Sequence, residues 1–257
     1  MPSLVSASVS STAAGAISLL FGFLSSVATA RLLGPEGAGL VAYCLWIAAA
    51  ATTFSDLGIP AILLRYASKC QTTELKDGGL TRALIGRFLA FASLFCVGLV
   101  AYALWKLSSG AEGDAVLWLV TSVYFLAFTG AHLAIGVDRG LFRFFENARL
   151  TVIGCVLQLP VLVVGAYFWG PAGAMIGYVV RYLPQITSLR LFLAGAKERQ
   201  GLVTKQMKQY GRNVWFSNVV GIFVWSRMEF LFLGLFASPY ELGLYVAGLT
   251  LANLVVQ

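Results

Sequence analysis

The stretch VSSTAAGAISLLFGFLSSVATA, which runs from Val9 to Ala30, contains no charged side chain. Its length suits a membrane-crossing helix, because the hydrocarbon core of a bilayer takes about 20 mostly apolar residues to span. A cleavable signal peptide would begin with a basic segment, whereas no charge occurs between Met1 and Ala30. We therefore predict that this stretch is the first of several transmembrane helices and that it stays in the mature protein.

The composition of the whole chain is typical of a membrane protein. Of its 257 residues, 59% are hydrophobic and 11% are charged, and the mean hydropathy is +0.82. Soluble domains are about 25% charged, and a soluble core could not bury this much apolar surface. The formal net charge of +7 would suggest a nucleic-acid partner for a soluble protein. Here we expect no such partner, because Lys and Arg collect in the cytoplasmic loops of membrane proteins.

Apolar segments of suitable length recur along the chain and predict an all-α, polytopic transmembrane helix bundle of about eight helices. The expected spans are Val9–Ala30, Ala38–Ile59, Leu84–Leu104, Ala115–Gly136, Leu150–Trp169, Ala172–Leu193, Val214–Phe236 and Leu242–Val256.

The distribution of basic residues predicts the orientation of these spans. With the N-terminus in the cytoplasm, the inner loops hold 13 Lys and Arg, and the outer loops hold only Arg31 and Lys106. Positive charge favours the cytoplasmic side, so we expect a cytoplasmic N-terminus. The remaining three basic residues, Arg87, Arg181 and Arg227, fall within spans.

Residues 35–42, PEGAGLVA, are similar to residues 239–246, PYELGLYV, which lie 204 positions later. In both places one apolar span precedes the Pro-Gly turn and another follows it. Six expected spans lie within the repeat length, so both copies have the same orientation. This pattern predicts two lobes related by an axis along the membrane normal.

The repeat also predicts how the chain is divided. We expect residues 1–196 to form a first lobe of about six helices and residues 197–212 to form a basic cytoplasmic linker. Residues 213–257 would then be the first two helices of an incomplete second lobe. On this basis we expect the sequence to be part of a protein of about 400 residues.

Short motifs in the turns resemble a known family. The stretch Arg31–Leu40 is similar to the LGPEGFG turn that follows the first helix of polysaccharide transporters, and Asp56–Gly58 followed by Arg65 and Tyr66 resembles their DLG…RY stretch. The start of the expected second lobe resembles their SRID…LG…GLY pattern at Ser226–Glu229, Leu233-Gly234 and Gly243–Tyr245. These transporters, which include the Wzx-type O-antigen flippases, are the polysaccharide branch of the multidrug/oligosaccharidyl-lipid/polysaccharide flippase superfamily.

The resemblance implies a flippase with a two-lobe fold in the bacterial inner membrane. Its substrate would be an undecaprenyl-pyrophosphate-linked oligosaccharide, an O-antigen or exopolysaccharide unit, moved by alternating access. Membrane lipid and other polysaccharide assembly proteins would be its partners, and it would need no cofactor. The alternatives are a cation-coupled multidrug or small-molecule antiporter of the same superfamily and a membrane-embedded glycan ligase or acyltransferase.

Charged residues within spans are the candidate substrate site, because each costs about 2.5–3.5 kcal/mol to insert at the bilayer centre. Arg181 falls near the middle of the sixth expected span, and Arg227 and Glu229 fall in the outer half of the seventh. In a central cavity these arginines would bind a pyrophosphate, which suits the fork geometry of Arg. Alternatively, Arg181 and Glu229 form a structural ion pair. Arg87, near the inner surface, either lines the cavity or snorkels outward.

Asp56, at the inner end of the second span, is a candidate ligand for a coupling cation. It could instead pair with Arg65 or serve as a polar helix end. We expect no catalytic or metal site, because His132 is the one histidine and the cysteines have no metal-ligand spacing. Short outer loops argue against the ligase, and intramembrane arginines favour an anionic substrate over a cationic drug.

Overall fold

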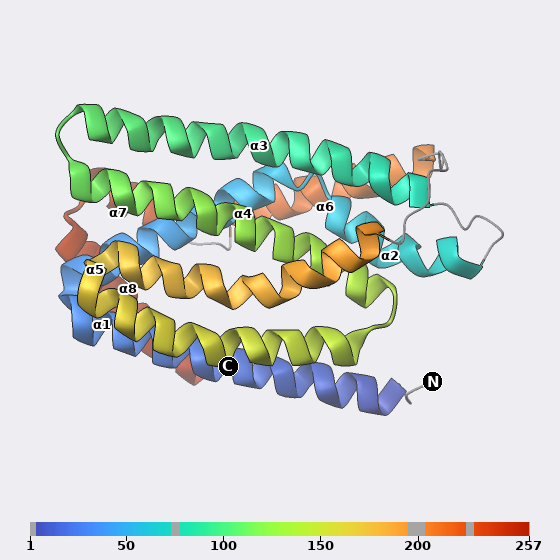
Figure 1. The fold of residues 1–257 in the computed structure, drawn as a ribbon, viewed down its shortest axis with the longest axis horizontal. Helices are drawn as coiled ribbons and strands as arrows, with labels where there is room; N and C mark the ends of the chain where they lie inside the picture. The colour runs from blue at the N-terminus through green and yellow to red at the C-terminus, as the bar shows by residue number, and fades with distance from the viewer. Residues whose placement is uncertain (1–3, 73–77, 195–203, 225–228, 257) are drawn as a thin grey trace.

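The computed structural model describes residues 4–72, 78–194, 204–224 and 229–256, and within these ranges the chain is helical without strands (Figure 1). This confirms the all-α class. The helices are α1 (Leu4–Ser55), α2 (Ile59–Thr72), α3 (Gly78–Ser108), α4 (Glu112–Gly140), α5 (Phe144–Ala194), α6 (Lys205–Val224), α7 (Glu229–Phe236) and α8 (Pro239–Val256).

Helices α1 and α5 each fold back on themselves at a Gly-Pro pair (Figure 1). Gly34 and Gly170 have φ values of 67° and 59°, a left-handed conformation that glycine adopts readily. The following Pro35 and Pro171 suit the first turn of the next segment, where a backbone donor is not needed. Together with α3 and α4, the two hairpins supply the six crossings expected up to residue 194. All four helices are long and apolar enough to cross a membrane.

Glycines let the two halves of α5 lie in close contact. A Cβ on Gly173 would overlap the backbone of Gly165, and a Cβ on Gly154 would overlap the carbonyl oxygen of Arg181. Small residues at facing positions are a general means of packing helices in membranes, where van der Waals contact replaces the hydrophobic effect between helices. The α5 hairpin is therefore held by backbone proximity, and this fixes the position of Arg181 against the preceding half.

Large apolar side chains cover the outside of these helices. Leu94 on α3 is 66% exposed, and Phe168 at the end of the first half of α5 is 68% exposed. Exposed surface of this kind is what the hydrocarbon of a bilayer covers. The chain is thus a multi-pass membrane protein in structure as well as in composition.

Two helical segments differ from the expectation that hydropathy gives. The basic region after the second span forms α2, which is too short to span a bilayer. It buries Ile59, Ile62 and Leu63 and exposes Arg65, so one face packs while the other stays polar. Helix α6 begins at Lys205, well before the expected span start at Val214.

The start of α6 is set by Thr204, whose hydroxyl accepts the backbone N–H of Met207 at 3.3 Å. Residues 205–212 of the expected linker are therefore the first two turns of a helix. The rest of the linker, residues 197–203, lies outside the described residues. So do residues 225–228, between α6 and α7.

The two copies of the sequence repeat pack against each other in the structure. A Cβ on Gly39 would overlap the carbonyl oxygen of Pro239, and a Cβ on Gly243 would overlap the carbonyl oxygen of Pro35. The offset of 204 pairs Pro35 with Pro239 and Gly39 with Gly243, so the contact is reciprocal. Reciprocal contact of matching positions is the property of a two-fold relation. The reciprocal contact thus relates the Gly34-Pro35 turn of α1 to the start of α8 by an approximate two-fold rotation.

Candidate functional site

Arg181 lies in the second half of α5 and is held by two neutral side chains. Its guanidinium donates to Gln158 Oε1 at 2.9 Å and to the hydroxyl of Ser18. Gln158 comes from the first half of α5 and Ser18 from the first crossing of α1, so the cluster joins three membrane crossings. The guanidinium also lies 5.7 Å from the ring centre of Tyr182.

Within the described ranges, no acidic side chain forms an ion pair with Arg181. Its partners have no charge, so the cluster retains a full positive charge inside the helix bundle. The Nε2 of the fully buried Gln158 has no hydrogen-bond partner among the described residues, and neither does the hydroxyl of buried Ser25. An arginine with neutral partners, next to a Gln158 amide that has a free donor, is suited to binding an anion.

Glu229 lies at the start of α7 and is exposed. Its Oε1 accepts a hydrogen bond from the hydroxyl of Tyr245 on α8 at 2.7 Å. The structural ion pair of Arg181 with Glu229 that the sequence left open is not among the ion pairs of the described residues. Arg227 lies outside the described residues.

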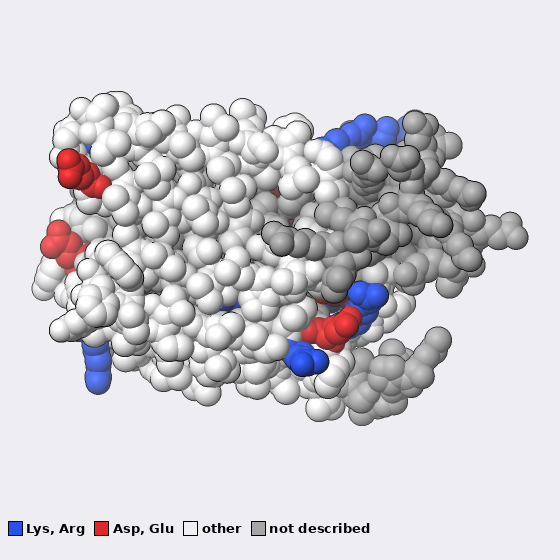
Figure 2. All heavy atoms as spheres, in the orientation of Figure 1, with Lys and Arg blue, Asp and Glu red and all other residues white. Residues whose placement is uncertain are grey.

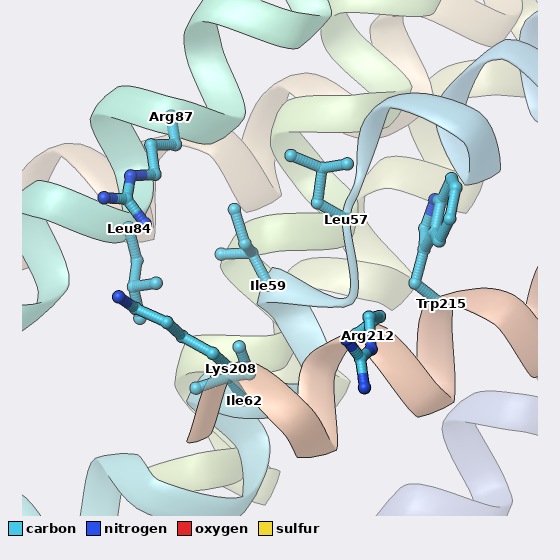
Figure 3. A pocket seen from close by; sticks show the side chains of 8 residues that line it. All are labelled: Leu57, Ile59, Ile62, Leu84, Arg87, Lys208, Arg212 and Trp215. Carbon is cyan, nitrogen blue, oxygen red and sulfur yellow. The ribbon is translucent and has the colours of Figure 1, made fainter. Parts of the chain in front are cut away.

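Arg87 lines the same pocket as two basic residues of the expected linker, residues 197–212. Together with Lys208 and Arg212 of α6 it lines a pocket of about 250 Å³ between α3, α6 and the α1–α2 turn (Figure 3). Sequence reasoning missed this cluster, because Arg87 and Lys208 are 121 positions apart and hydropathy carries no information on such pairs. The only signal was the basic character of both segments.

Asp56 closes the turn between α1 and α2. Its Oδ1 accepts the backbone N–H of Gly58 at 2.8 Å, and its side chain is buried. Burial raises the pKa of Asp56 to about 6, while the hydrogen bond from Gly58 acts in the opposite direction. The possible partner Arg65 instead lies over the ring of Tyr210, 4.5 Å from its centre. Asp56 is therefore a polar turn residue whose carboxyl group has a raised pKa.

A second set of buried polar groups lies between α4 and α5. Ser188 donates to Asp138 Oδ2 at 2.8 Å, and Gln185 Nε2 donates to Thr151 Oγ1 at 3.0 Å. The Oε1 of Gln185 and the Oδ1 of Asn147 are buried without partners among the described residues. The sequence analysis did not single out Gln185, Thr151, Asn147 and Ser188, because uncharged polar side chains hardly change the hydropathy of a span. Asp138 lies beyond the expected span Ala115–Gly136 and was not singled out either.

The charges are distributed unevenly along the molecule. On the face shown in Figure 2, most of the described Lys and Arg side chains lie toward the end away from the α3–α4 turn. Glu112 and Asp114 lie at that turn, where Asp114 pairs with Lys106 at 3.1 Å. Among the described residues, no group of three or more His, Cys, Asp or Glu could hold a metal ion.

The protein is a bundle of antiparallel, apolar membrane crossings that holds the guanidinium of Arg181 between them. Its class is therefore that of a multi-pass membrane protein. The chain belongs to the polysaccharide biosynthesis protein family, whose model matches residues 4–257. This is the family of the Wzx-type polysaccharide transporters, so the resemblance seen in the turn motifs is confirmed. Its members are transporters rather than enzymes.

A solved structure described as protein A has a similar fold, with a TM-score of 0.70 at 15% sequence identity. The match covers 98% of this chain and 61% of that one, so the chain spans less than two thirds of the length of the solved chain. At this identity the likeness shows the fold alone. Among curated proteins, none matches this chain in sequence.

Proposed function

We propose that the protein containing this chain is a flippase for undecaprenyl-pyrophosphate-linked oligosaccharide. It would move an O-antigen or exopolysaccharide unit across the bacterial inner membrane. The observation that carries this proposal is the Arg181 cluster, a positive charge inside the bundle with neutral partners. A pyrophosphate is the anionic part of such a substrate, and Arg binds phosphate oxygens in a bidentate manner. The membership of the family supports the same substrate class.

The proposed mechanism is alternating access between two lobes. The reciprocal contact of Gly39 and Gly243 with the opposite turns supports it, since two lobes related by a two-fold axis can rock about such a contact. In this mechanism the sugar and pyrophosphate cross through a central cavity while the lipid tail stays in the bilayer. Arg181, Arg227 and Glu229 are the residues that we propose to line it.

Asp56 is the residue that we propose for coupling transport to an ion gradient. A buried carboxyl group with a pKa of about 6 can take up and release a proton near physiological pH. The N-terminus would lie in the cytoplasm, which puts Asp56 at the cytoplasmic end of the second crossing.

Substitution of Arg181 in the intact transporter tests the proposal. Arg181→Lys should retain part of the glycan export because it keeps the charge, and Arg181→Gln should lose most of it. Ser18→Ala is the matched control, since it removes one hydrogen bond and leaves the charge and the bond to Gln158 in place. Export is measured as surface glycan in cells that lack their own flippase.

The amount of each variant in the membrane must be measured alongside export. A structural role of Arg181 would appear as lost protein, because truncating one member of a buried polar pair typically costs a few kcal/mol of stability. Normal abundance together with normal export for Arg181→Gln would remove Arg181 from the substrate site and would take away the main support for an anionic substrate.

A further inference from the structure

The pocket at the inner end of the bundle combines apolar walls with a basic edge. We call it the inner-end pocket and define it by Leu57, Leu84, Arg87, Lys208, Arg212 and Trp215, with two isoleucines of α2. Its volume is about 250 Å³. The Arg87 and Lys208 side chains extend from α3 and α6 toward the same side, while the head group of Arg212 points away from them (Figure 3).

The charge of the pocket is of one sign. None of the described residues that line it is acidic, and Arg87, Lys208 and Arg212 supply three positive charges from two helices. Like charges held near one another on separate elements repel, so an anion between Arg87 and Lys208 would stabilise the folded arrangement. Arg and Lys both bind phosphate oxygens through charge-assisted hydrogen bonds.

The remaining walls suit a molecule that is apolar next to its charge. Leu57, Leu84 and the half-buried Trp215 form them together with the isoleucines. Trp is enriched where membrane meets water, because its ring tolerates both surroundings. A free phosphate ion would leave these walls uncovered, whereas a lipid presents a phosphate and a chain together.

We propose that the inner-end pocket binds the phosphate headgroup of a lipid in the cytoplasmic leaflet, with Arg87 and Lys208 as its ligands. Basic pockets between transmembrane helices on the cytoplasmic side bind anionic headgroups in other membrane proteins. The pocket shares no residue with the Arg181 cluster, so this site does not depend on the proposed transport function.

The ligand would join the first lobe to α6. That helix already contacts the α1–α2 turn: Trp215 Nε1 donates to the carbonyl oxygen of Phe54 at 3.2 Å, and a Cβ on Gly58 would overlap the carbonyl oxygen of Gly211. A phosphate held by Arg87 of α3 and Lys208 of α6 adds a bridge at the same place. Bound lipid should therefore make the protein more resistant to unfolding.

Short-chain phosphatidylglycerol, titrated into the purified protein in a zwitterionic detergent, tests the site. The midpoint of thermal unfolding should rise and saturate. Arg87→Gln and Lys208→Gln should each weaken the apparent affinity about tenfold, the effect expected from losing one charge-assisted hydrogen bond. Lys205→Gln, an exposed lysine one turn earlier on α6 that does not line the pocket, should keep the affinity of the unchanged protein.

Two further ligands separate the sources of the phosphate. Sodium phosphate at equal concentration should give no saturable rise, and an equal rise would assign the pocket to a free anion and overturn the proposal. Farnesyl pyrophosphate, a short prenyl lipid, should also bind, and tighter binding than phosphatidylglycerol would identify the prenyl lipid as the preferred occupant.

Two results with these variants would contradict the proposed site. Equal weakening by Lys205→Gln would mean that diffuse charge on α6 attracts the lipid and that the pocket does not bind it. An unchanged affinity in the double variant of Arg87 and Lys208 would have the same meaning. If Arg87→Gln does not fold, Arg87→Lys keeps the charge and should bind, so the comparison with Lys208→Gln remains.

Discussion

At Asp56 the chain buries a carboxyl group in the turn that ends the second crossing. Its pKa is raised to about 6 from an ordinary value near 3.9. At a pH between these two values, the carboxyl group is protonated in the folded state and ionised in the unfolded chain. The stabilising contribution of the protonated group is therefore complete below about pH 4 and is lost as the pH rises toward 6. Above that pH the buried charge opposes folding.

Asp56→Asn should remove this dependence. Asparagine keeps an Oδ1 that can accept the Gly58 N–H, and it carries no charge at any pH. We expect the variant to exceed the original protein in stability at pH 7–8 by up to about 3 kcal/mol and to match it near pH 4. Thermal unfolding in detergent across this range measures the difference, in which all other carboxyl groups cancel. Parallel curves for the two proteins would contradict the raised pKa.

The sequence could predict which residues are charged within the membrane but not what they touch. Hydropathy located Arg181, because one charge in an apolar span stands out. Its partners are 23 and 163 residues away, at Gln158 and Ser18, and both are uncharged. Arg87 and Lys208 are also far apart in the sequence, so their position in one pocket could not be predicted either. Arg227 lies outside the described residues, so its cavity role stays a prediction.

Among the elements, the hairpin of α5 gives the clearest relation of sequence to packing. Gly173 faces Gly165 without room for a side-chain atom, and the opposing atoms are backbone atoms that cannot swing aside. Gly173→Ala should therefore lower the free energy of unfolding by about 1–3 kcal/mol, the range found for overpacked interiors.

Gly98 on α3 is the matched control for that substitution. A Cβ there would meet no atom within 4 Å. Alanine favours a helix over glycine, so Gly98→Ala should leave the stability unchanged or raise it slightly. Unfolding of both variants in a denaturing detergent measures the effect. Equal stability of Gly173→Ala and Gly98→Ala would show that the two halves of α5 are not in close contact.

The ends of the helices depend both on apolar length, which hydropathy reports, and on local features such as helix caps, which it does not. Apolar length predicted the crossings in α1, α3, α4 and α5. It could not predict α2, whose helix depends on one buried face, or the start of α6, which depends on the cap at Thr204. A capping box at Ser238 and Glu241 likewise starts α8, with the Ser238 N–H donating to Glu241 Oε2 at 2.8 Å.

For the whole molecule, the orientation in the membrane is the property that basic residues predict. Among the described residues, the end of the bundle with Arg65, Arg139 and Lys205 holds many more basic residues than the end with Arg31 and Lys106. We therefore expect the first of these ends, and the N-terminus with it, to lie in the cytoplasm. Single cysteines at Ser109, in the exposed α3–α4 turn, and at Gln206, exposed on α6, test it in a cysteine-free background. An impermeant thiol reagent on intact cells should label the first and spare the second. Reversed labelling would contradict the orientation.

The sequence repeat acquires a physical meaning in the structure. Similarity between residues 35–42 and 239–246 is slight on its own. The reciprocal overlap at Gly39 and Gly243 shows why both copies keep a glycine: each approaches the backbone of the opposite turn. The repeat itself could be found in the sequence, whereas the contact between its two copies could not. The division into two lobes stays a prediction.

Transport in proteoliposomes tests the central claim most directly. The intact transporter is reconstituted with a fluorescent prenyl-pyrophosphate-linked oligosaccharide, and movement is followed by the access of an impermeant glycosidase to the sugar. We predict that the sugar on the inner leaflet becomes accessible with the protein present, that Arg181→Gln abolishes this movement, and that a cationic dye is not moved. Extrusion of the dye while the lipid-linked sugar stays protected would contradict the account and would identify a cation antiporter instead.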